Sequence, residues 1–391
     1  MSEKADPSSP DDYKGVDDTQ KEVLDDEPRS ILMGIISQLT KGTDLHRVTL
    51  PTFVLEPRSM LERITDFMCH PDLLLQTHSK EDPVARFVDV VRYYVSGWHI
   101  RPKGVKKPYN PVLGEHFRCK YQYPDGTMGL FVSEQTSHHP PISNYFFSAP
   151  ESYVMVEGEL KPTSKYLGNS AATMMTGETR IHLTNRPGEV YSLNLPNVYA
   201  RGLLFGTMIL ELGDNVVIKC EKTDLICELE FKVKGYFMGT YNALGGRIRR
   251  ISKPREILYE ISGKWSDVST LKNVKTGEQQ VFFDAENEHI FPKTVAPEPE
   301  QETYESRRVW SKVTAAIGSR DLDTATEWKS RIEARQREHR IEREAAGDGW
   351  TPRFFKVAGN GDDPETFEFA ILECVFPFTG VSYWWADISM N

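Results

Sequence analysis

The sequence ELEFKVK (residues 228–234) alternates strictly between charged and apolar side chains. Successive side chains of a β-strand point to opposite faces of a sheet, so this pattern predicts a strand with one buried and one exposed face. Looser alternation recurs throughout residues 115–285, and turn residues such as Pro-Asp-Gly (124–126) separate the segments. Many short strands in succession, without intervening helices, predict an antiparallel meander that closes into a barrel.

Helical patterns flank this β region on both sides. SILMGIISQLTKG (30–42) is typical of a short amphipathic helix, with Ser30 as its cap, and residues 59–79 predict another helix. DPVARFVDVVRYYVSGWH (82–99) has Asp-Pro at its start, which favours a capped helix there. After APEPE (296–300) the chain becomes charged and helical in pattern. We therefore expect a mainly β domain with helices packed around it.

The negative charge is concentrated at the N-terminus. The chain of 391 residues has a formal net charge of −10, and residues 1–28 hold ten acidic and three basic side chains, a net −7. This stretch is also rich in Ser and Pro, which predicts a disordered acidic tail. An acidic total argues against a nucleic-acid partner, yet the remaining chain is close enough to neutral to hold local basic patches.

The five cysteines form no CxxC pair, so neither a disulfide framework nor a zinc knuckle is expected. Sparse cysteines fit a reducing compartment and predict a cytoplasmic protein. No apolar run reaches the length of a spanning helix. The sequence also lacks a Gly-x-Ser-x-Gly elbow, a P-loop and a dinucleotide glycine fingerprint, so we expect no cofactor, no bound metal and no catalysis.

EQTSHHPP (134–141) places two adjacent histidines, His138 and His139, before two prolines. A metal, a proton transfer and a phosphate are the three chemistries that would use such a pair. Adjacent residues of a regular strand point to opposite faces, which disfavours shared metal ligation. The fixed φ angles of the prolines would stiffen a turn, and a stiff turn can direct both imidazoles at one anion.

Two other stretches suit the same anion. VKKPYNPVLGEHF (105–117) has Lys106, Lys107 and Asn110 in a proline-bracketed loop, and KSRIEARQR (329–337) repeats a charged residue every four positions, as Lys329, Glu333 and Arg337. Residues four apart share one face of a helix. The alternatives without a ligand are a solvated surface turn for residues 105–117 and an exposed ladder of salt bridges for residues 329–337. The residues alone leave this choice open.

EQTSHHPP resembles the fingerprint of the oxysterol-binding-protein-related lipid transfer family, with Thr136 where valine is usual. Supporting matches follow in order along residues 30–350: KKPYNPVLGE (106–115), YEISGKW (259–265), FFDA (282–285) and ESRRVWSKV (305–313). The resemblance implies an incomplete antiparallel β-barrel that encloses a lipid tunnel, with an N-terminal helical lid and charged C-terminal helices. It implies a lipid carrier rather than an enzyme. FFDAENE also approximates a motif that recruits proteins to the endoplasmic reticulum, but its strand-like position favours a structural role.

The resemblance also implies ligands and the residues that hold them. The head group of phosphatidylinositol 4-phosphate would contact Lys107, Asn110, His138, His139, Lys329, Glu333 and Arg337. The lid sequence ISQLTKGTDLHRVTLPTFVLEPRSMLER (36–63) is similar to the fungal homologues that exchange phosphatidylserine for that phosphoinositide. Phosphatidylserine would then contact Leu45, Leu50, Lys107, Asn110 and Ser164. Sterol is the alternative second ligand.

These matches predict three regions and one function. Residues 1–28 would form the disordered tail, residues 29–355 the lipid-binding domain with its lid at about 29–55, and residues 356–391 a segment with no predicted structure. The implied activity is non-vesicular exchange of the two lipids between endoplasmic reticulum and plasma membrane, by a cytoplasmic protein that binds both membranes peripherally at their contact sites. A lipid-regulated sensor and a phosphoinositide-metabolising enzyme are the alternatives from other classes.

Overall fold

The computed structural model describes residues 21–45, 48, 50–168, 170–203, 207–234 and 239–357, together with the backbone of three short strands at 367–369, 373–375 and 382–384. Most of the predicted tail and most of the predicted C-terminal segment therefore lie outside the described residues. The described part of the tail has regular structure, because a short strand forms at Glu22–Val23 and a helix begins at Asp26.

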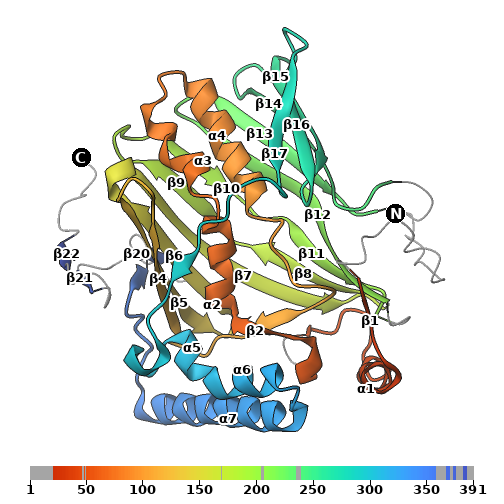
Figure 1. Cartoon of the computed structure of the whole chain (residues 1–391). Helices are drawn as coiled ribbons and strands as arrows, with labels where there is room; N and C mark the ends of the chain where they lie inside the picture. Colours follow the sequence, from red (N-terminus) through yellow and green to blue (C-terminus); the bar gives the residue numbers. More distant parts are fainter. Residues whose placement is uncertain are drawn as a thin grey trace.

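The fold is mainly β, as expected, and a 16-stranded antiparallel sheet dominates the described residues (Figure 1). Its spatial order runs β17-β16-β15-β14-β13-β12-β10-β9-β7-β6-β5-β4-β18, while β1, β8 and β11 pair beside this path. The two end strands, β17 and β18, do not pair with each other in the described part of the chain, so the barrel remains incomplete. The strands of this sheet are β1 (Glu22–Val23), β4 (His116–Gln122), β5 (Met128–His138), β6 (Pro141–Ala149), β7 (Val154–Tyr166), β8 (Ala171–Thr176), β9 (Thr179–Leu183), β10 (Val190–Leu193), β11 (Asn197–Arg201), β12 (Thr207–Cys220), β13 (Leu225–Lys232), β14 (Ala243–Arg250), β15 (Ile257–Lys264), β16 (Val268–Asn273), β17 (Gln279–Asp284) and β18 (Lys293–Thr294).

Strand β13 shows why the alternating segments became strands. Its apolar residues Leu225, Cys227, Leu229 and Phe231 are buried in the main core, while the charged residues between them face outward. It pairs with β12 on one side and β14 on the other, so its backbone groups are hydrogen-bonded along both edges. The period-two pattern thus predicted both the strand and its buried face correctly.

Helices α2 (Met60–Arg63), α3 (Asp72–Leu75) and α4 (Pro83–Ser96) lie across the sheet (Figure 1). The predicted start of α4 is confirmed, because the Asp82 side chain accepts a hydrogen bond from the Val84 backbone N–H at 3.0 Å. A buried ion pair between Arg86 and Glu189 fastens the helix to the sheet, with N–O distances of 2.6 and 2.8 Å. Both side chains are 4% exposed, so loss of either partner would leave a buried charge.

Two helical predictions were wrong in detail. The helix predicted from Ser30 is α1 (Asp26–Ile36), which begins four residues earlier. An acidic residue and a proline are favourable in a first helical turn, and Asp26 and Pro28 supply them. The helix predicted over 59–79 is broken into α2, η4 (Ile64–Met68), α3 and η5 (Thr77–Ser79). Pro71 disfavours helical backbone at the preceding residue, which separates η4 from α3.

The C-terminal charged helices are α5 (Ser306–Val309), α6 (Ser311–Gly318) and α7 (Leu322–Ala346), and α7 forms one outer side of the molecule (Figure 1). The Trp310 ring stacks on Tyr109, the last residue of β3 (Lys107–Tyr109), with centroids 4.7 Å apart, which attaches these helices to that strand. Asp321 caps α7 by accepting from the Thr324 N–H, and Gly347 ends it at a φ of 72°. Among the described residues, no helix is both long enough and apolar enough to cross a membrane.

Candidate functional site

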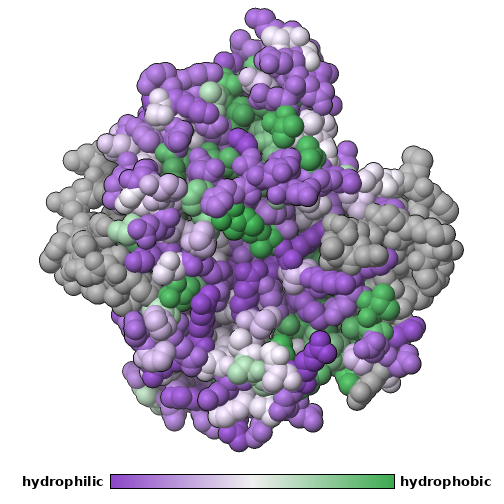
Figure 2. Space-filling model, viewed as in Figure 1, coloured by the Kyte–Doolittle hydropathy of each residue, from purple (hydrophilic) through white to green (hydrophobic). Residues whose placement is uncertain are grey.

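A mostly apolar cavity of about 250 Å³ lies between the sheet, helix α2 and the N-terminal lid. Strands β6, β7, β8, β11 and β12 supply wall residues such as Leu160 and Leu212, and Trp98 and Trp265 supply aromatic surface. All five residues of the predicted phosphatidylserine set line this one cavity: Leu45, Leu50, Lys107, Asn110 and Ser164. The visible outer surface is mostly hydrophilic, with small separate hydrophobic patches (Figure 2).

The lid is fastened over this cavity by backbone and side-chain contacts. Gly42 N–H donates to Tyr166 O at 2.7 Å, and Tyr166 N–H donates back to Thr43 O at 2.9 Å. The apolar residues Leu32 and Ile36 of α1 pack with Leu45 in a separate small core. These contacts join the lid to the end of strand β7, so lid and wall close the cavity together.

Lys106 also lines the cavity, and its ammonium group has partners within the protein. Its Nζ donates to Glu22 Oε1 at 2.7 Å and to Phe53 O at 2.8 Å. Both partners belong to the N-terminal region that covers the cavity. Lys106 therefore helps to hold that region in place. Its neighbour Lys107 is the lysine of this segment that is placed to contact a ligand.

Lys107 begins β3 (Lys107–Tyr109), which pairs in parallel with β2 (Leu55–Ser59). Burial lowers the pKa of Lys107, and the nearby positive charge of Lys329 lowers it further, while Asp44 and Glu333 act in the opposite direction. The fold therefore brings Lys107, Lys329 and Glu333 close together, although more than two hundred positions separate them in the sequence. A partly desolvated pair of cations is unfavourable alone and favours an anionic ligand.

Helix α7 has features of both interpretations of residues 329–337, the anion site and the ladder of salt bridges. Lys329 Nζ lies 2.8 Å from Glu333 Oε1, so the ion pair of the ladder interpretation is present. Lys329 is only 16% exposed, however, whereas the Arg331–Glu327 pair on the same helix is 60% and 61% exposed. Arg337 is exposed, and among the described residues no hydrogen bond or ion pair joins it to the other six predicted head-group residues. Lys329 and Glu333 thus lie near Lys107, which lines the cavity, and Arg337 lies farther along the helix.

The histidine pair lies beside the same loop. His138 ends β5, His139 and Pro140 form the turn, and Pro141 begins β6. The His138 and His139 ring centroids are 4.6 Å apart at an interplanar angle of 70°. His138 Nδ1 is 3.2 Å from the carbonyl oxygen of Pro111, a residue of the cavity wall. Because a carbonyl only accepts hydrogen bonds, Nδ1 carries the hydrogen, and this contact positions the pair at the cavity edge.

Glu134 and Thr136 of EQTSHHPP have structural roles that the sequence did not reveal. The carboxylate of Glu134, the first residue of EQTSHHPP, accepts the backbone N–H groups of Arg353 and Phe354 at 2.8 Å each. Burial raises the pKa of Glu134 to about 7. Thr136, the departure from the usual motif, is buried and donates to Asn144 Oδ1 at 2.6 Å, so its hydroxyl is satisfied.

Glu115, the last residue of KKPYNPVLGE (106–115), is fully buried and joins three segments. It accepts hydrogen bonds from Ser59 Oγ at 2.5 Å, Val112 N–H at 3.0 Å and Trp310 Nε1 at 2.9 Å. These bonds hold the Lys107 loop against both β2 and the C-terminal helices. The position of Lys107 beside Lys329 therefore depends on a buried carboxylate whose partners are distant in the sequence.

The FFDA sequence is structural, as its strand-like position indicated. Phe282 is 2% exposed and Phe283 is fully buried in β17. A linear recruitment motif would have to present these rings to a partner, and burial in the main core prevents that.

An apolar cavity closed by a lid, with cations at its edge and an incomplete β-barrel around it, defines a lipid-binding protein. The chain belongs to the oxysterol-binding protein family, because the family model matches residues 34–316 and 314–373. The second matched segment extends past residue 355, where the sequence analysis placed the end of the domain.

Relatives and solved structures agree with this assignment. An oxysterol-binding protein homolog of Schizosaccharomyces pombe is 49% identical over 351 residues, which cover 87% of this chain and 73% of the relative. Oxysterol-binding protein homolog 7 of Saccharomyces cerevisiae is 47% identical, covering 86% of this chain and 77% of the relative. The Osh1 ORD domain in complex with cholesterol has a TM-score of 0.72 and 26% identity, covering 95% of this chain and 90% of that one. The Osh3 ORD in complex with PI(4)P, at 18% identity and a TM-score of 0.63, shares the fold.

Proposed function

We propose that this protein exchanges phosphatidylserine for phosphatidylinositol 4-phosphate between the endoplasmic reticulum and the plasma membrane. The observation that supports the proposal most is the combination of an apolar cavity with Lys107 and Lys329 at its edge. Acyl chains gain from burial against the apolar wall, at about 25 cal/mol for each Å² removed from water. The cations offer the phosphate an electrostatic partner. No step of this activity needs covalent chemistry or a cofactor.

Exchange follows because the two predicted ligand sets share residues of one cavity. Lys107 and Asn110 belong to both predicted ligand sets, so one lipid must leave before the other enters. A gradient of the phosphoinositide between two membranes would then drive the second lipid against its own gradient. The phosphoinositide would use Lys107, Lys329, Glu333 and the histidine pair, and its larger charge would compensate for the cost of holding two cations together.

The proposal places the protein in the cytoplasm, in peripheral contact with both membranes. Lysine and arginine side chains near an anionic leaflet each contribute about 1 kcal/mol of attraction. The cationic edge of the cavity would thus orient the lid toward the membrane surface. Membrane lipids are the proposed partners, and the proposal includes no nucleic acid.

Sterol in place of phosphatidylserine is a second candidate, favoured by the likeness to the Osh1 ORD domain in complex with cholesterol. Two measurements decide between them. Mass spectrometry of lipids that co-purify with the protein identifies the bound species. A liposome transfer assay with fluorescent sensors then measures phosphatidylserine, sterol and phosphoinositide in parallel. Transfer of sterol without phosphatidylserine would establish the second candidate, and binding without release would indicate a sensor.

A further inference from the structure

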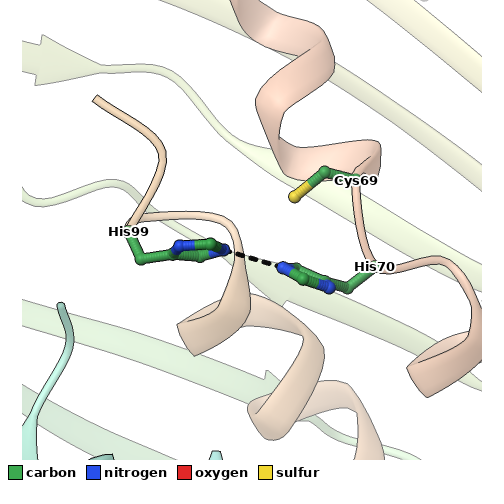
Figure 3. A group of neighbouring side chains, drawn as sticks. All are labelled: Cys69, His70 and His99. Carbon is green, nitrogen blue, oxygen red and sulfur yellow. Dashed lines mark hydrogen bonds between the residues drawn. The ribbon is translucent and has the colours of Figure 1, made fainter. Parts of the chain in front are cut away.

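Three potential metal ligands meet behind the cavity wall: Cys69, His70 and His99 (Figure 3). Their ligand atoms, one sulfur and two imidazole nitrogens, all lie within 4.8 Å of one another. Cys69 is 5% exposed, His70 is fully buried and His99 is half-buried. Neither the lipid exchange proposed above nor the packing of the main core uses this chemistry.

The backbone sets two of these ligands side by side for a local reason. Pro71 prevents the helical backbone from continuing through His70, and the chain turns there between η4 and α3. His99 follows the end of α4, two residues after Gly97. The turn and the helix end therefore face each other across a short gap, and the two histidine rings point toward one another (Figure 3).

The hydrogen bonds of His70 determine which of its ring nitrogens carries the hydrogen and which one faces the cluster. Its Nδ1 lies 2.9 Å from the carbonyl oxygen of His289, so Nδ1 carries the hydrogen. Its Nε2 lies 2.8 Å from Nε2 of His99, where it must act as the acceptor. A histidine that donates Nδ1–H to a backbone carbonyl and directs an unprotonated Nε2 inward has the outer contact usual for metal-binding histidines.

Neighbouring groups shield the cluster. The ring of Phe283 lies 5.4 Å from His70 and 5.6 Å from His99, centroid to centroid. The nearby carboxylate of Asp66 is held by Arg58 through two hydrogen bonds of 2.7 and 2.6 Å. Asp66 is thus engaged elsewhere, and three protein atoms remain to surround an ion.

We propose that Cys69, His70 and His99 bind a zinc ion, with water in the fourth position. Sulfur and imidazole nitrogen are the ligands that zinc prefers, at about 2.3 Å and about 2.0–2.1 Å respectively. The ion would take the place of the hydrogen between the two histidines: His99 would bind as the tautomer that carries its hydrogen on Nδ1, and the Cys69 thiol would release its proton to solvent. The two Nε2 atoms would separate slightly to admit the ion, and the sulfur would move toward them.

Such an ion would act on the lipid cavity through its neighbours in the chain. Phe67 precedes the Cys69–His70 pair, Trp98 precedes His99, and both rings line the cavity. The two rings also meet edge to face, with centroids 4.7 Å apart. A zinc ion would therefore join the segment after η4 to the end of α4 and fix this part of the cavity wall.

Cobalt and zinc titrations of the full chain test the site directly. Cobalt added to the metal-free protein should produce a thiolate charge-transfer band in the near ultraviolet. Cys69→Ser should abolish the band, while Cys227→Ser, which removes another buried cysteine in β13, should retain it. A competition titration with a chromophoric zinc chelator should show zinc binding weakened at least about 100-fold by Cys69→Ser, since loss of an outer contact alone typically costs 10–100-fold.

The half-buried His99 provides a second variant should the Cys69 variant fail to fold. His99→Gln should weaken zinc binding by a similar factor, and zinc should raise the Tm of the parent but not of this variant. Absence of a thiolate band in the parent would overturn the proposal. A band of equal strength in Cys69→Ser, or one lost in Cys227→Ser, would overturn it as well. None of these readouts depends on which lipid the protein carries.

Discussion

The wall and the edge of the cavity are built in different ways. Some polar groups of the wall find partners within the protein, as Ser164 Oγ does with Thr173 Oγ1 at 2.9 Å, whereas the buried indole N–H groups of Trp98 and Trp265 find none among the described residues. At the edge, no ion pair or hydrogen bond from the Lys107 side chain is present among the described residues, and His139 is exposed. The wall is therefore mostly apolar, whereas the edge keeps, at Lys107, a charge that a ligand can use.

This difference predicts a division of effects between the two regions. Substitutions in the lid and wall should alter which acyl chains or second lipid the cavity accepts. Substitutions at the edge should alter phosphoinositide affinity and leave the folded state nearly as stable as before. Four predictions test that division, beginning with the largest effect.

Leu50→Asp should abolish phosphatidylserine transfer between liposomes and spare part of phosphoinositide transfer. Leu50 is half-buried and lines the cavity from the lid. Burial of a leucine contributes about 1.5–3 kcal/mol, and a carboxylate there also places negative charge beside an apolar chain and an anionic head group. Phosphatidylserine has few head-group contacts, so it should depend more on the lid.

A lid variant outside the cavity provides the control for Leu50→Asp. Ile31 lies on α1 and is 47% exposed, so Ile31→Asp should leave both transfer rates near those of the parent. Equal loss of both lipids in Leu50→Asp would show that the lid does not discriminate between them, and would remove the distinction between wall and edge.

The double substitution His138→Ala with His139→Ala should reduce phosphoinositide extraction on the order of a hundredfold or more. Each hydrogen bond to a charged group contributes about 1.5–3 kcal/mol, and the pair would supply two. Phosphatidylserine transfer by the same protein serves as the internal control, because fewer of these contacts are expected for it. Undiminished extraction of the phosphoinositide would exclude the histidines from the head-group site.

Lys329→Ala should weaken phosphoinositide binding about tenfold or more, by loss of one charge-assisted hydrogen bond, with little change in Tm. Arg331→Ala is the matched control, because it breaks the exposed Arg331–Glu327 pair on the same helix. Exposed ion pairs contribute about 0–1 kcal/mol to stability. Equal binding by both variants and the parent would restore the interpretation of residues 329–337 as a salt-bridge ladder.

The features that the sequence predicted correctly depend on patterns among residues that are close together in the chain. Burial on one face of β13 requires period-two alternation, and the Asp82 cap acts on a backbone group two residues away. The Lys107, Lys329 and Glu333 grouping was reachable only through family resemblance, since no local rule joins positions so far apart. The residues that support it escaped prediction because their partners are distant: Glu115 bonds to Trp310, and Glu134 to residues 353–354.

The cysteine–histidine cluster shows the same limit. Cys69 and His70 are adjacent, and His99 follows 29 positions later, which matches no spacing typical of zinc sites. The absence of a metal motif led to the expectation of no metal, whereas the fold brings the three ligands together. Whether they bind zinc is decided by the cobalt and zinc titrations.

The smallest predicted effect concerns the hydrogen bonds by which Glu134 of β5 holds residues 353–354, in the segment that follows α7. The pKa of Glu134 is raised from 4.5 to about 7 by burial, which outweighs the two backbone N–H donors that favour the charged carboxylate. Between pH 4.5 and 7 the folded state therefore binds a proton that the unfolded state has lost. This contribution to the free energy of unfolding is fully present below pH 4.5, falls as the pH rises through 7 and is constant above that.

Glu134→Gln should remove this dependence, because an amide does not titrate. The glutamine oxygen can accept only one of the two N–H groups at Arg353 and Phe354 with the same geometry, so stability at pH 7 should also change by about 1 kcal/mol. Urea unfolding at pH 5, 6, 7 and 8 measures both quantities, and subtraction of the variant from the parent cancels the other titrating groups. Parallel pH curves for the two proteins would contradict the prediction.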